Sequence, residues 1–216
     1  MFDKKHLAQQ FESLEQQHLT AKHGIWLFIA TEFLFFSPMF LAYIVYRIVY
    51  PEASIQGSHS LDLFFGTLNT GILLTSSLTM TLAVHSAREG KQKPLTLFLW
   101  LTAALGVAFL LVKGLEYRSD ILKHVVPGKT MDAEGHHLRP THIFFFIYYC
   151  LTGLHALHLS VGVGLVITIA LKSRRNVFSK DYYNPVEVTS LYWHFVDSIW
   201  VMLYPMLYLM GRGGAS

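Results

Sequence analysis

Seven ionisable side chains lie inside or at the edge of long apolar stretches, where such groups are rare. Glu32 stands near the middle of an apolar run from residue 24 to residue 45. A charge at the centre of a bilayer costs about 2.5 to 3.5 kcal/mol even on the lenient insertion scale, so these groups indicate buried partners or a functional site. The seven candidates are Glu32, Lys113, Glu116, His155, His158, His194 and Asp197.

Six of these residues form pairs spaced three apart. The pairs are Lys113 with Glu116, His155 with His158, and His194 with Asp197. Residues three apart lie on one side of a helix, so each pair can bond locally or to a neighbouring helix. The spacing alone leaves two interpretations open, hydrogen bonding between helices and proton handling, and the first is the commoner use of such groups.

The histidines do not match a heme or metal centre. His142 and His155 are thirteen apart, a spacing that places two heme ligands on one helix face, but no second helix offers another such pair. The Glu-x-x-His pattern of a di-iron bundle and the His-Glu-x-x-His pattern of a zinc protease are both absent from the sequence. We therefore predict no catalytic, metal-binding or cofactor-binding residue in this chain.

The composition is that of a membrane protein. The chain is 52% hydrophobic and 14% charged, against roughly 25% charged for an ordinary soluble domain. A net charge of +3, scattered along the chain, argues against a nucleic-acid partner. The single cysteine, Cys150, cannot form an internal disulfide, and the polar start of the chain does not have the pattern of a cleaved signal peptide.

Five stretches are long and apolar enough to cross a bilayer as helices, which takes about 20 residues each. We therefore predict an all-α integral membrane protein with a five-transmembrane-helix bundle at residues 23–212. Residues 1–22 are predicted to form a cytoplasmic amphipathic N-terminal segment, because their apolar residues recur at helical spacing. The predicted spans are residues 24–46, 63–85, 95–115, 143–171 and 188–210.

The distribution of Lys and Arg predicts the orientation. Ten of these residues fall on the side of the N-terminus and six on the opposite side, which favours a cytoplasmic N-terminus and an outside C-terminus. The polar loop at residues 118–139 contains His124, His136 and His137, and we interpret it as a solvated connector, since no tetrahedral ligand spacing accompanies these histidines.

Five segments, taken in order, resemble subunit III of the heme-copper respiratory oxidases. The resemblance covers residues 23–210, and five separate motifs in family order make it specific. The matching segments are HGIWLFIATEFLFF (residues 23–36), LNTGILLTSSLTMTLAVHSA (68–87), LGVAFLLVKGLEY (105–117), TGLHALHLSVG (152–162) and YWHFVDSIWVMLY (192–204).

The resemblance implies a noncatalytic subunit, cytochrome c oxidase subunit III, of an aerobic terminal oxidase in the respiratory chain. Its implied partners are the catalytic subunit I, which would carry the hemes and copper, other oxidase subunits and membrane lipids. It also implies structural phospholipid, support of proton uptake and, because the chain resembles the bacterial five-span form, a place in the bacterial cytoplasmic membrane. By position, Glu32 matches the family's membrane-embedded glutamate, and the other matching polar positions are Glu116, His155, His158, His194 and Asp197.

From the residues themselves we expect Glu32 to be hydrogen-bonded by His155 or His158 on the fourth span. Three other functions remain as alternatives: subunit III of a quinol oxidase, an accessory protein of nitric oxide reductase, and a small proton-coupled transporter. Transport is disfavoured because the sequence has neither an internal repeat nor paired Gly/Pro-broken helices. The electron donor cannot be identified from this chain, because its site lies on other subunits.

Overall fold

The computed structural model of the chain describes residues 10–11, 13–122, 140–180 and 182–209. Its described part is helical, apart from one isolated bridge between Ser179 and Tyr182. This confirms the predicted all-α architecture. The helices are α1 (Leu14–Val49), α2 (Pro51–Ser60), α3 (Leu63–Arg88), α4 (Gln92–Leu122), α5 (Pro140–Arg174) and α6 (Asn184–Tyr204), and a π-helical turn, η2 (Pro205–Leu209), follows α6.

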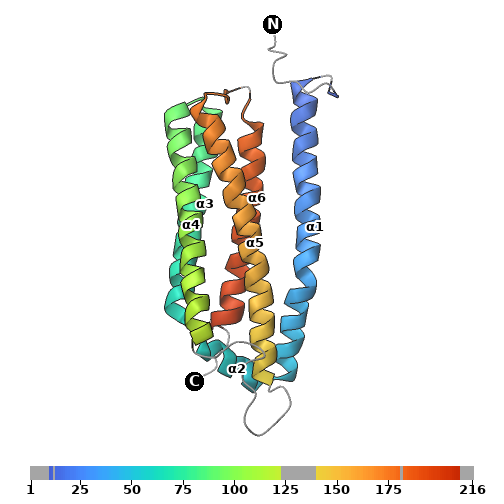
Figure 1. Cartoon of the computed structure of the whole chain (residues 1–216). Coiled ribbons are helices and arrows are strands. Elements are labelled where there is room, and N and C mark those ends of the chain that lie inside the picture. The colour runs from blue at the N-terminus through green and yellow to red at the C-terminus, as the bar shows by residue number, and fades with distance from the viewer. Residues whose placement is uncertain (1–9, 12, 123–139, 181, 210–216) are drawn as a thin grey trace.

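The predicted spans 24–46, 63–85, 95–115 and 143–171 lie within long helices, whereas α6 ends at Tyr204, before the end of the predicted span 188–210. Four of the described helices, α1, α3, α4 and α5, are long and apolar enough to cross a membrane. Helix α6 is not among these four, although it lies alongside them in the bundle (Figure 1). Residues 14–22 are continuous with α1, while residues 1–9 of the predicted N-terminal segment lie outside the described residues.

The helix ends follow local sequence signals. The Ser13 hydroxyl accepts a hydrogen bond from the Gln16 amide at 3.1 Å, and the Asp62 carboxylate accepts one from the Phe64 amide at 2.9 Å. Both side chains satisfy amide groups that have no partner within the helix. Gly90 adopts a φ of 74° directly after α3, a conformation that glycine tolerates without strain, and the chain turns there into α4.

Helices α3 to α6 pack together, and α1 flanks this group (Figure 1). The centre of the group is aromatic: the side chains of Trp193 and Trp200 on α6 are completely buried. Helix α1 contributes far less to the core, because only 6% of its most apolar window is buried, against 39% in α5. Its position must therefore depend on a small number of specific contacts.

One set of contacts holds α1 at the end of the bundle where α2 lies. The Tyr43 hydroxyl donates to the Met206 carbonyl in η2, and the Tyr46 hydroxyl donates to the Pro140 carbonyl at 2.9 Å. Gly57 lies where a Cβ atom would collide with the ring of Phe144, so α2 approaches α5 closely.

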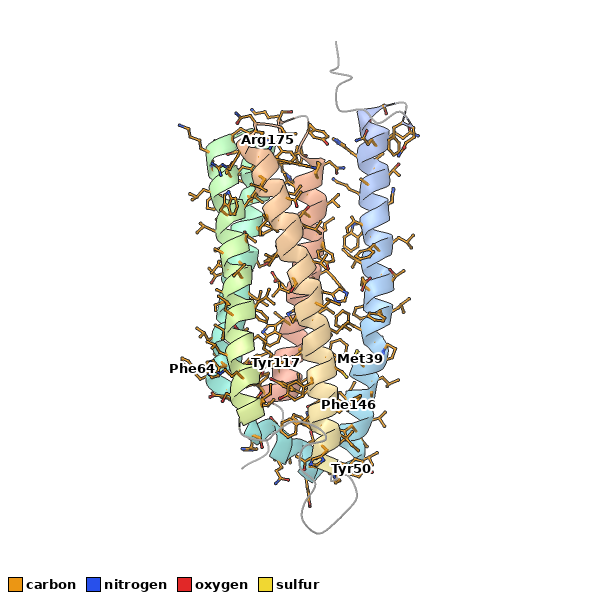
Figure 2. All side chains as sticks on the ribbon, in the orientation of Figure 1. Met39, Tyr50, Phe64, Tyr117, Phe146 and Arg175 are labelled. Atoms are coloured by element: carbon orange, nitrogen blue, oxygen red, sulfur yellow. The ribbon has the colours of Figure 1, made fainter. Side chains whose placement is uncertain are left out.

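A charged cluster holds α1 at the opposite end of the bundle, which is the end where Figure 2 labels Arg175. Glu187, in the first turn of α6, lies 3.0 Å from the Lys22 Nζ atom of α1 and 2.6 Å from the Arg88 Nη2 atom of α3. Burial of the carboxyl opposes ionisation, but the hydrogen bonds from Lys22 and Arg88 outweigh this effect and hold the pKa of Glu187 below its ordinary value. The sequence analysis did not identify Glu187.

The Glu187 cluster predicts a pH-dependent contribution to stability. A carboxyl whose pKa is lower in the folded state stabilises the fold above its unfolded pKa, about 4.3, and loses this contribution as the pH falls through the folded value. The substitution Glu187→Gln should therefore lower the free energy of unfolding by up to about 1 kcal/mol at neutral pH and by progressively less below pH 4.

The measurement is thermal unfolding of both proteins in mild detergent across this pH range. Glu89→Gln is the matched control, because Glu89 lies at the same end but pairs with the neighbouring residues Lys91 and His85. An equal loss of stability at neutral and acid pH would show that Glu187 does not act through its charge.

Candidate functional site

Glu32 on α1 is paired with His158 on α5. The Glu32 Oε2 atom lies 3.0 Å from the His158 Nε2 atom, and the two side chains are 19% and 14% exposed. His158 was one of the two partners expected for Glu32. The Phe36 ring packs 5.1 Å from the imidazole, and the Tyr192 hydroxyl donates to the His158 carbonyl at 3.1 Å, so several neighbours fix this part of α5.

The hydrogen bonds of His158 restrict the protonation of this pair. The Nδ1 atom lies 2.9 Å from the Leu154 carbonyl oxygen, which can only accept, so Nδ1 carries a proton. The bond between Nε2 and Glu32 then needs one further proton. Either the carboxyl holds it and donates to a neutral imidazole, or the imidazolium holds it and donates to a carboxylate. In both forms the pair shares one proton and has no net charge, which suits it to a low-dielectric environment.

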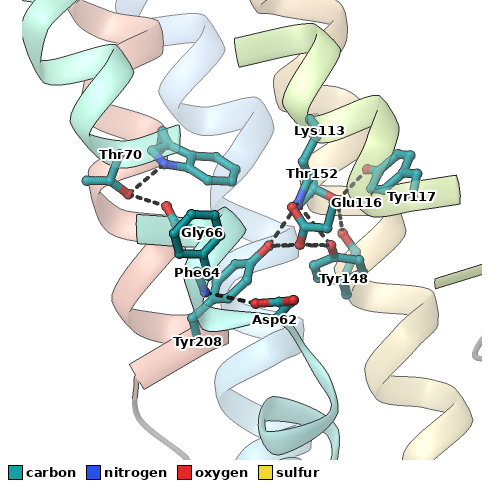
Figure 3. Close-up of polar contacts among 11 residues, drawn as sticks. Asp62, Phe64, Gly66, Thr70, Lys113, Glu116, Tyr117, Tyr148, Thr152 and Tyr208 are labelled. Atoms are coloured by element: carbon teal, nitrogen blue, oxygen red, sulfur yellow. Dashed lines mark hydrogen bonds and ion pairs between the residues drawn. The ribbon is translucent and has the colours of Figure 1, made fainter. Parts of the chain in front are cut away.

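Lys113 and Glu116 form a second, completely buried pair with their side chains 2% and 1% exposed (Figure 3). The Lys113 Nζ atom donates to Glu116 Oε2 at 3.0 Å, to the Tyr148 hydroxyl at 2.9 Å and to the Tyr208 hydroxyl at 2.8 Å. Both tyrosine hydroxyls in turn donate to Glu116 Oε1, Tyr148 at 2.8 Å. All three ammonium protons therefore have acceptors, and the cluster joins α4, α5 and η2 without net charge.

His155 and His158, three residues apart on α5, point to different neighbours. His155 is 1% exposed and packs against Phe109 and Trp200, with ring centroids 5.6 Å and 5.2 Å away. Neither of its ring nitrogens has a hydrogen-bond partner within the described residues. Positions three apart differ by about 60° around a helix, which is enough to turn His155 into the core and His158 toward α1.

The polar pair on α6 faces α3. The His194 Nδ1 atom lies 2.8 Å from the Ser77 hydroxyl, and Asp197 is 5% exposed. Neither Asp197 oxygen has a hydrogen-bond partner in the described part of the chain. The seven predicted residues thus do not converge on one centre: they occupy four separate places, between α1 and α5, at the Lys113 cluster, in the core, and between α3 and α6.

The sequence analysis missed the two tyrosines of the Lys113 cluster. The side chain of Tyr208 is fully buried and bonded to both charges. The signal was available in principle, because a buried Lys and Glu need more partners than each other. Among the described residues no group of three or more His, Cys, Asp or Glu could hold a metal ion, and His124, His136 and His137 lie outside them.

The chain matches the sequence profile of the family described as "Cytochrome c oxidase subunit III" over residues 11–212. It is 32% identical to cytochrome c oxidase subunit 3 of Synechocystis sp., over 87% of this chain and 74% of that protein. It is 30% identical to cytochrome c oxidase subunit 3 of Alkalihalophilus pseudofirmus, over 88% and 87% of the two chains. Quinol oxidase subunit 3 of Bacillus spizizenii is 27% identical, over 88% and 87%.

The Lys113 cluster predicts a large cost when one charge is removed alone. The substitution Lys113→Met leaves Glu116 buried without its cation and should lower the free energy of unfolding by about 3 to 5 kcal/mol. Combining it with Glu116→Leu should restore most of this loss, because no unpaired charge remains. Thermal unfolding in mild detergent compares the variants, with the exposed Lys93→Met as control. If Lys113→Met costs no more than Lys93→Met, the buried pair does not stabilise the bundle.

Proposed function

Because the chain belongs to the cytochrome c oxidase subunit III family and is a subunit III of a respiratory oxidase, we propose that it is the noncatalytic membrane subunit that stabilises the heme-copper subunit I. In this role it binds lipid and supports proton uptake. The single observation that carries this proposal is the pair of Glu32 and His158, since it joins the weakly buried helix α1 to α5 through one shared proton.

The pair suits both a structural and a proton-linked role. Its proton can move between the carboxyl and the imidazole without any change of net charge, so both forms are tolerated within hydrocarbon. Its side chains are also partly exposed, unlike those of the Lys113 cluster, so they are not sealed inside the bundle. We therefore assign the proton-linked role to Glu32 and His158, and a structural role to Lys113 and Glu116.

We propose five membrane spans, with α6 as the fifth. Helix α6 runs alongside the four apolar helices and carries the two largest buried side chains of the core, Trp193 and Trp200 (Figure 1). The charged cluster around Glu187 lies at the end where α1 begins, which is the proposed cytoplasmic side by the count of Lys and Arg. The N-terminus is then cytoplasmic and the C-terminus outside, in the bacterial cytoplasmic membrane.

The chain spans different shares of its relatives. It covers 87% of the Alkalihalophilus relative, but 69% of the cytochrome c oxidase subunit 3 of Hippopotamus amphibius, to which it is 31% identical. The relatives include both a cytochrome c oxidase subunit and a quinol oxidase subunit. Hemes and copper are assigned to the partner subunits.

Structural phospholipid has a suitable place between α1 and α5. An apolar groove with a volume of about 540 Å³ lies there, lined by side chains such as Pro38, Val45 and Ile147, with Tyr46 and Tyr50 toward its end. Tyrosines are common at the level of lipid headgroups, and the apolar walls suit an acyl chain. We propose that the groove holds one chain of a bound phospholipid.

Two substitutions of Glu32 separate the two roles of the pair. Glu32→Gln can still donate a hydrogen bond to His158 Nε2 but has no proton to transfer, whereas Glu32→Leu leaves this nitrogen unpaired. We expect the Gln variant to assemble normally but to shorten the turnover lifetime and slow proton uptake. We expect the Leu variant to lose assembly as well, at a cost of about 1 to 3 kcal/mol.

The measurements are subunit retention, turnover lifetime and proton uptake of the intact oxidase in lipid vesicles. Thr31→Ala is the control, because Thr31 is an exposed polar neighbour that bonds only the Phe28 carbonyl of its own helix. If the Gln variant matches the unsubstituted protein in all three properties, the pair has no proton-linked role. If the Leu variant assembles normally, the pair has no structural role.

Co-purification tests the proposed function as a whole. Purification in mild detergent, followed by absorption spectra and a mass-spectrometric inventory, should recover the chain with a heme-bearing partner that reduces oxygen. A heme-free preparation that couples solute uptake to protons would instead support a transporter.

A further inference from the structure

Two phenylalanines flank Glu32 on the same face of α1. Phe28 lies four residues before Glu32 and Phe36 lies four residues after it, and residues four apart are neighbours on a helix surface. The Phe36 ring packs against the His158 imidazole, with the two ring centroids 5.1 Å apart. The position of Glu32 relative to His158 therefore depends on what these two phenylalanines contact.

Helix α6 contacts both phenylalanines through residues three apart. The Tyr192 ring lies 6.1 Å from the Phe28 ring, and the Phe195 ring lies 6.5 Å from the Phe36 ring, measured between centroids. The Tyr192 hydroxyl also donates to the His158 carbonyl at 3.1 Å. Helix α6 thus contacts α1 on one side of the pair and α5 on the other, although the pair itself lies on those two helices.

Tyr192 makes these contacts from a buried position, because the residue is only 5% exposed. Gly162, one turn after His158 on α5, lies beside it: a Cβ atom there would be 3.4 Å from Tyr192 Cε1 and 3.3 Å from Trp193 Cε3. The rings of α6 therefore pack directly on the backbone of α5, and this packing limits the movement of the Tyr192 ring. Glu32 is close enough to interact electrostatically with the same tyrosine.

The imidazole of His158 is held at two points. Tyr192 bonds the carbonyl of the residue and so fixes its backbone, while the Leu154 carbonyl accepts from Nδ1 at 2.9 Å and so fixes the orientation of the ring. With the backbone and one ring nitrogen held, the Nε2 atom faces Glu32 at 3.0 Å.

Neighbouring hydroxyls do not duplicate the bond from Tyr192. Ser160, two residues after His158, donates to the Ala156 carbonyl of its own helix. Thr31, next to Glu32, donates to the Phe28 carbonyl, also within its own helix. Within the described residues, the hydroxyl that joins the backbone of His158 to another helix is therefore that of Tyr192.

Resting on the proposed function, we propose that Tyr192 is the positioning residue of the proton-sharing pair: its hydroxyl holds His158 at the depth at which Nε2 meets Glu32. Tyr192 does not transfer the proton, because its single hydroxyl proton is donated to the His158 carbonyl. Its ring acts on the other partner through Phe28. Without the hydroxyl, α5 can rotate relative to α1, and a hydrogen bond weakens steeply when its angle is distorted.

The substitution Tyr192→Phe tests the hydroxyl alone, since it keeps the ring that packs against Phe28. Tyr43→Phe is the matched control, because it removes a bond from another buried tyrosine hydroxyl of this bundle to a backbone carbonyl, that of Met206. Infrared spectra of the intact oxidase identify the Glu32 carboxyl band as the one that Glu32→Gln removes. We expect Tyr192→Phe to shift this band and Tyr43→Phe to leave it unchanged. An unchanged band in Tyr192→Phe, or an equal shift in both variants, would overturn the positioning role.

Proton uptake in lipid vesicles measures the consequence. We expect Tyr192→Phe to remain in the complex and to slow uptake about twofold to tenfold, the factor that corresponds to loss of one neutral hydrogen bond. In a protein that already carries Glu32→Gln, the same substitution should cause no further slowing, because the proton that Tyr192 positions is absent. Further slowing in that background would show that Tyr192 acts on the stability of the bundle and not on the pair.

The two measurements separate this inference from the proposed function. If Glu32→Gln leaves uptake unchanged while Tyr192→Phe shifts the Glu32 band, the positioning role is supported and the proton-linked role of the pair is wrong. If Glu32→Gln slows uptake while Tyr192→Phe changes neither the band nor the uptake, only the positioning role is wrong.

Discussion

Hydrocarbon offers no hydrogen bonds, and this constraint determines how the polar side chains of the bundle are placed. Most of the described polar side chains bond to another helix, to a neighbour on the same helix or to the backbone, while His155 and Asp197 have no hydrogen-bond partner within the described residues. Glu32 meets His158 between α1 and α5, and Trp193 and Trp200 of α6 donate to Ser76 and Thr70 of α3. Because these bonds join particular helices at particular depths, they specify which helices are neighbours in a way that apolar packing alone does not.

Helix α1 illustrates the consequence. Little of its surface is buried, so it is held mainly by polar contacts at different depths. These are Lys22 with Glu187, Glu32 with His158, Tyr43 with the Met206 carbonyl and Tyr46 with the Pro140 carbonyl. The first two of these contacts hold charge or a shared proton. The position of α1 and the protonation of its partners are therefore physically linked, which connects the architecture of this subunit to the proton chemistry proposed for the oxidase.

The sequence predicted the helices well because long apolar runs are strong signals. It did not predict α2, since residues 51–60 are polar and begin with a proline that also suits a loop. Spacing predicted the contact of Lys113 with Glu116, because these two long, flexible side chains are three residues apart on α4 and can meet. The same spacing did not bring His155 to His158, since short imidazoles follow the directions of their own positions. Which tyrosines join a charged cluster depends on the rotation of each helix about its own axis. A single sequence does not specify this rotation.

The central claim is that Glu32 and His158 act as one unit that joins α1 to α5. A double-mutant cycle in the assembled oxidase tests it most directly, with Glu32→Leu, His158→Leu and the combined variant compared by unfolding in mild detergent. The account predicts that the combined variant is more stable than the sum of the single losses implies, with a coupling of about 1 kcal/mol or more. Strict additivity of the two losses would contradict it.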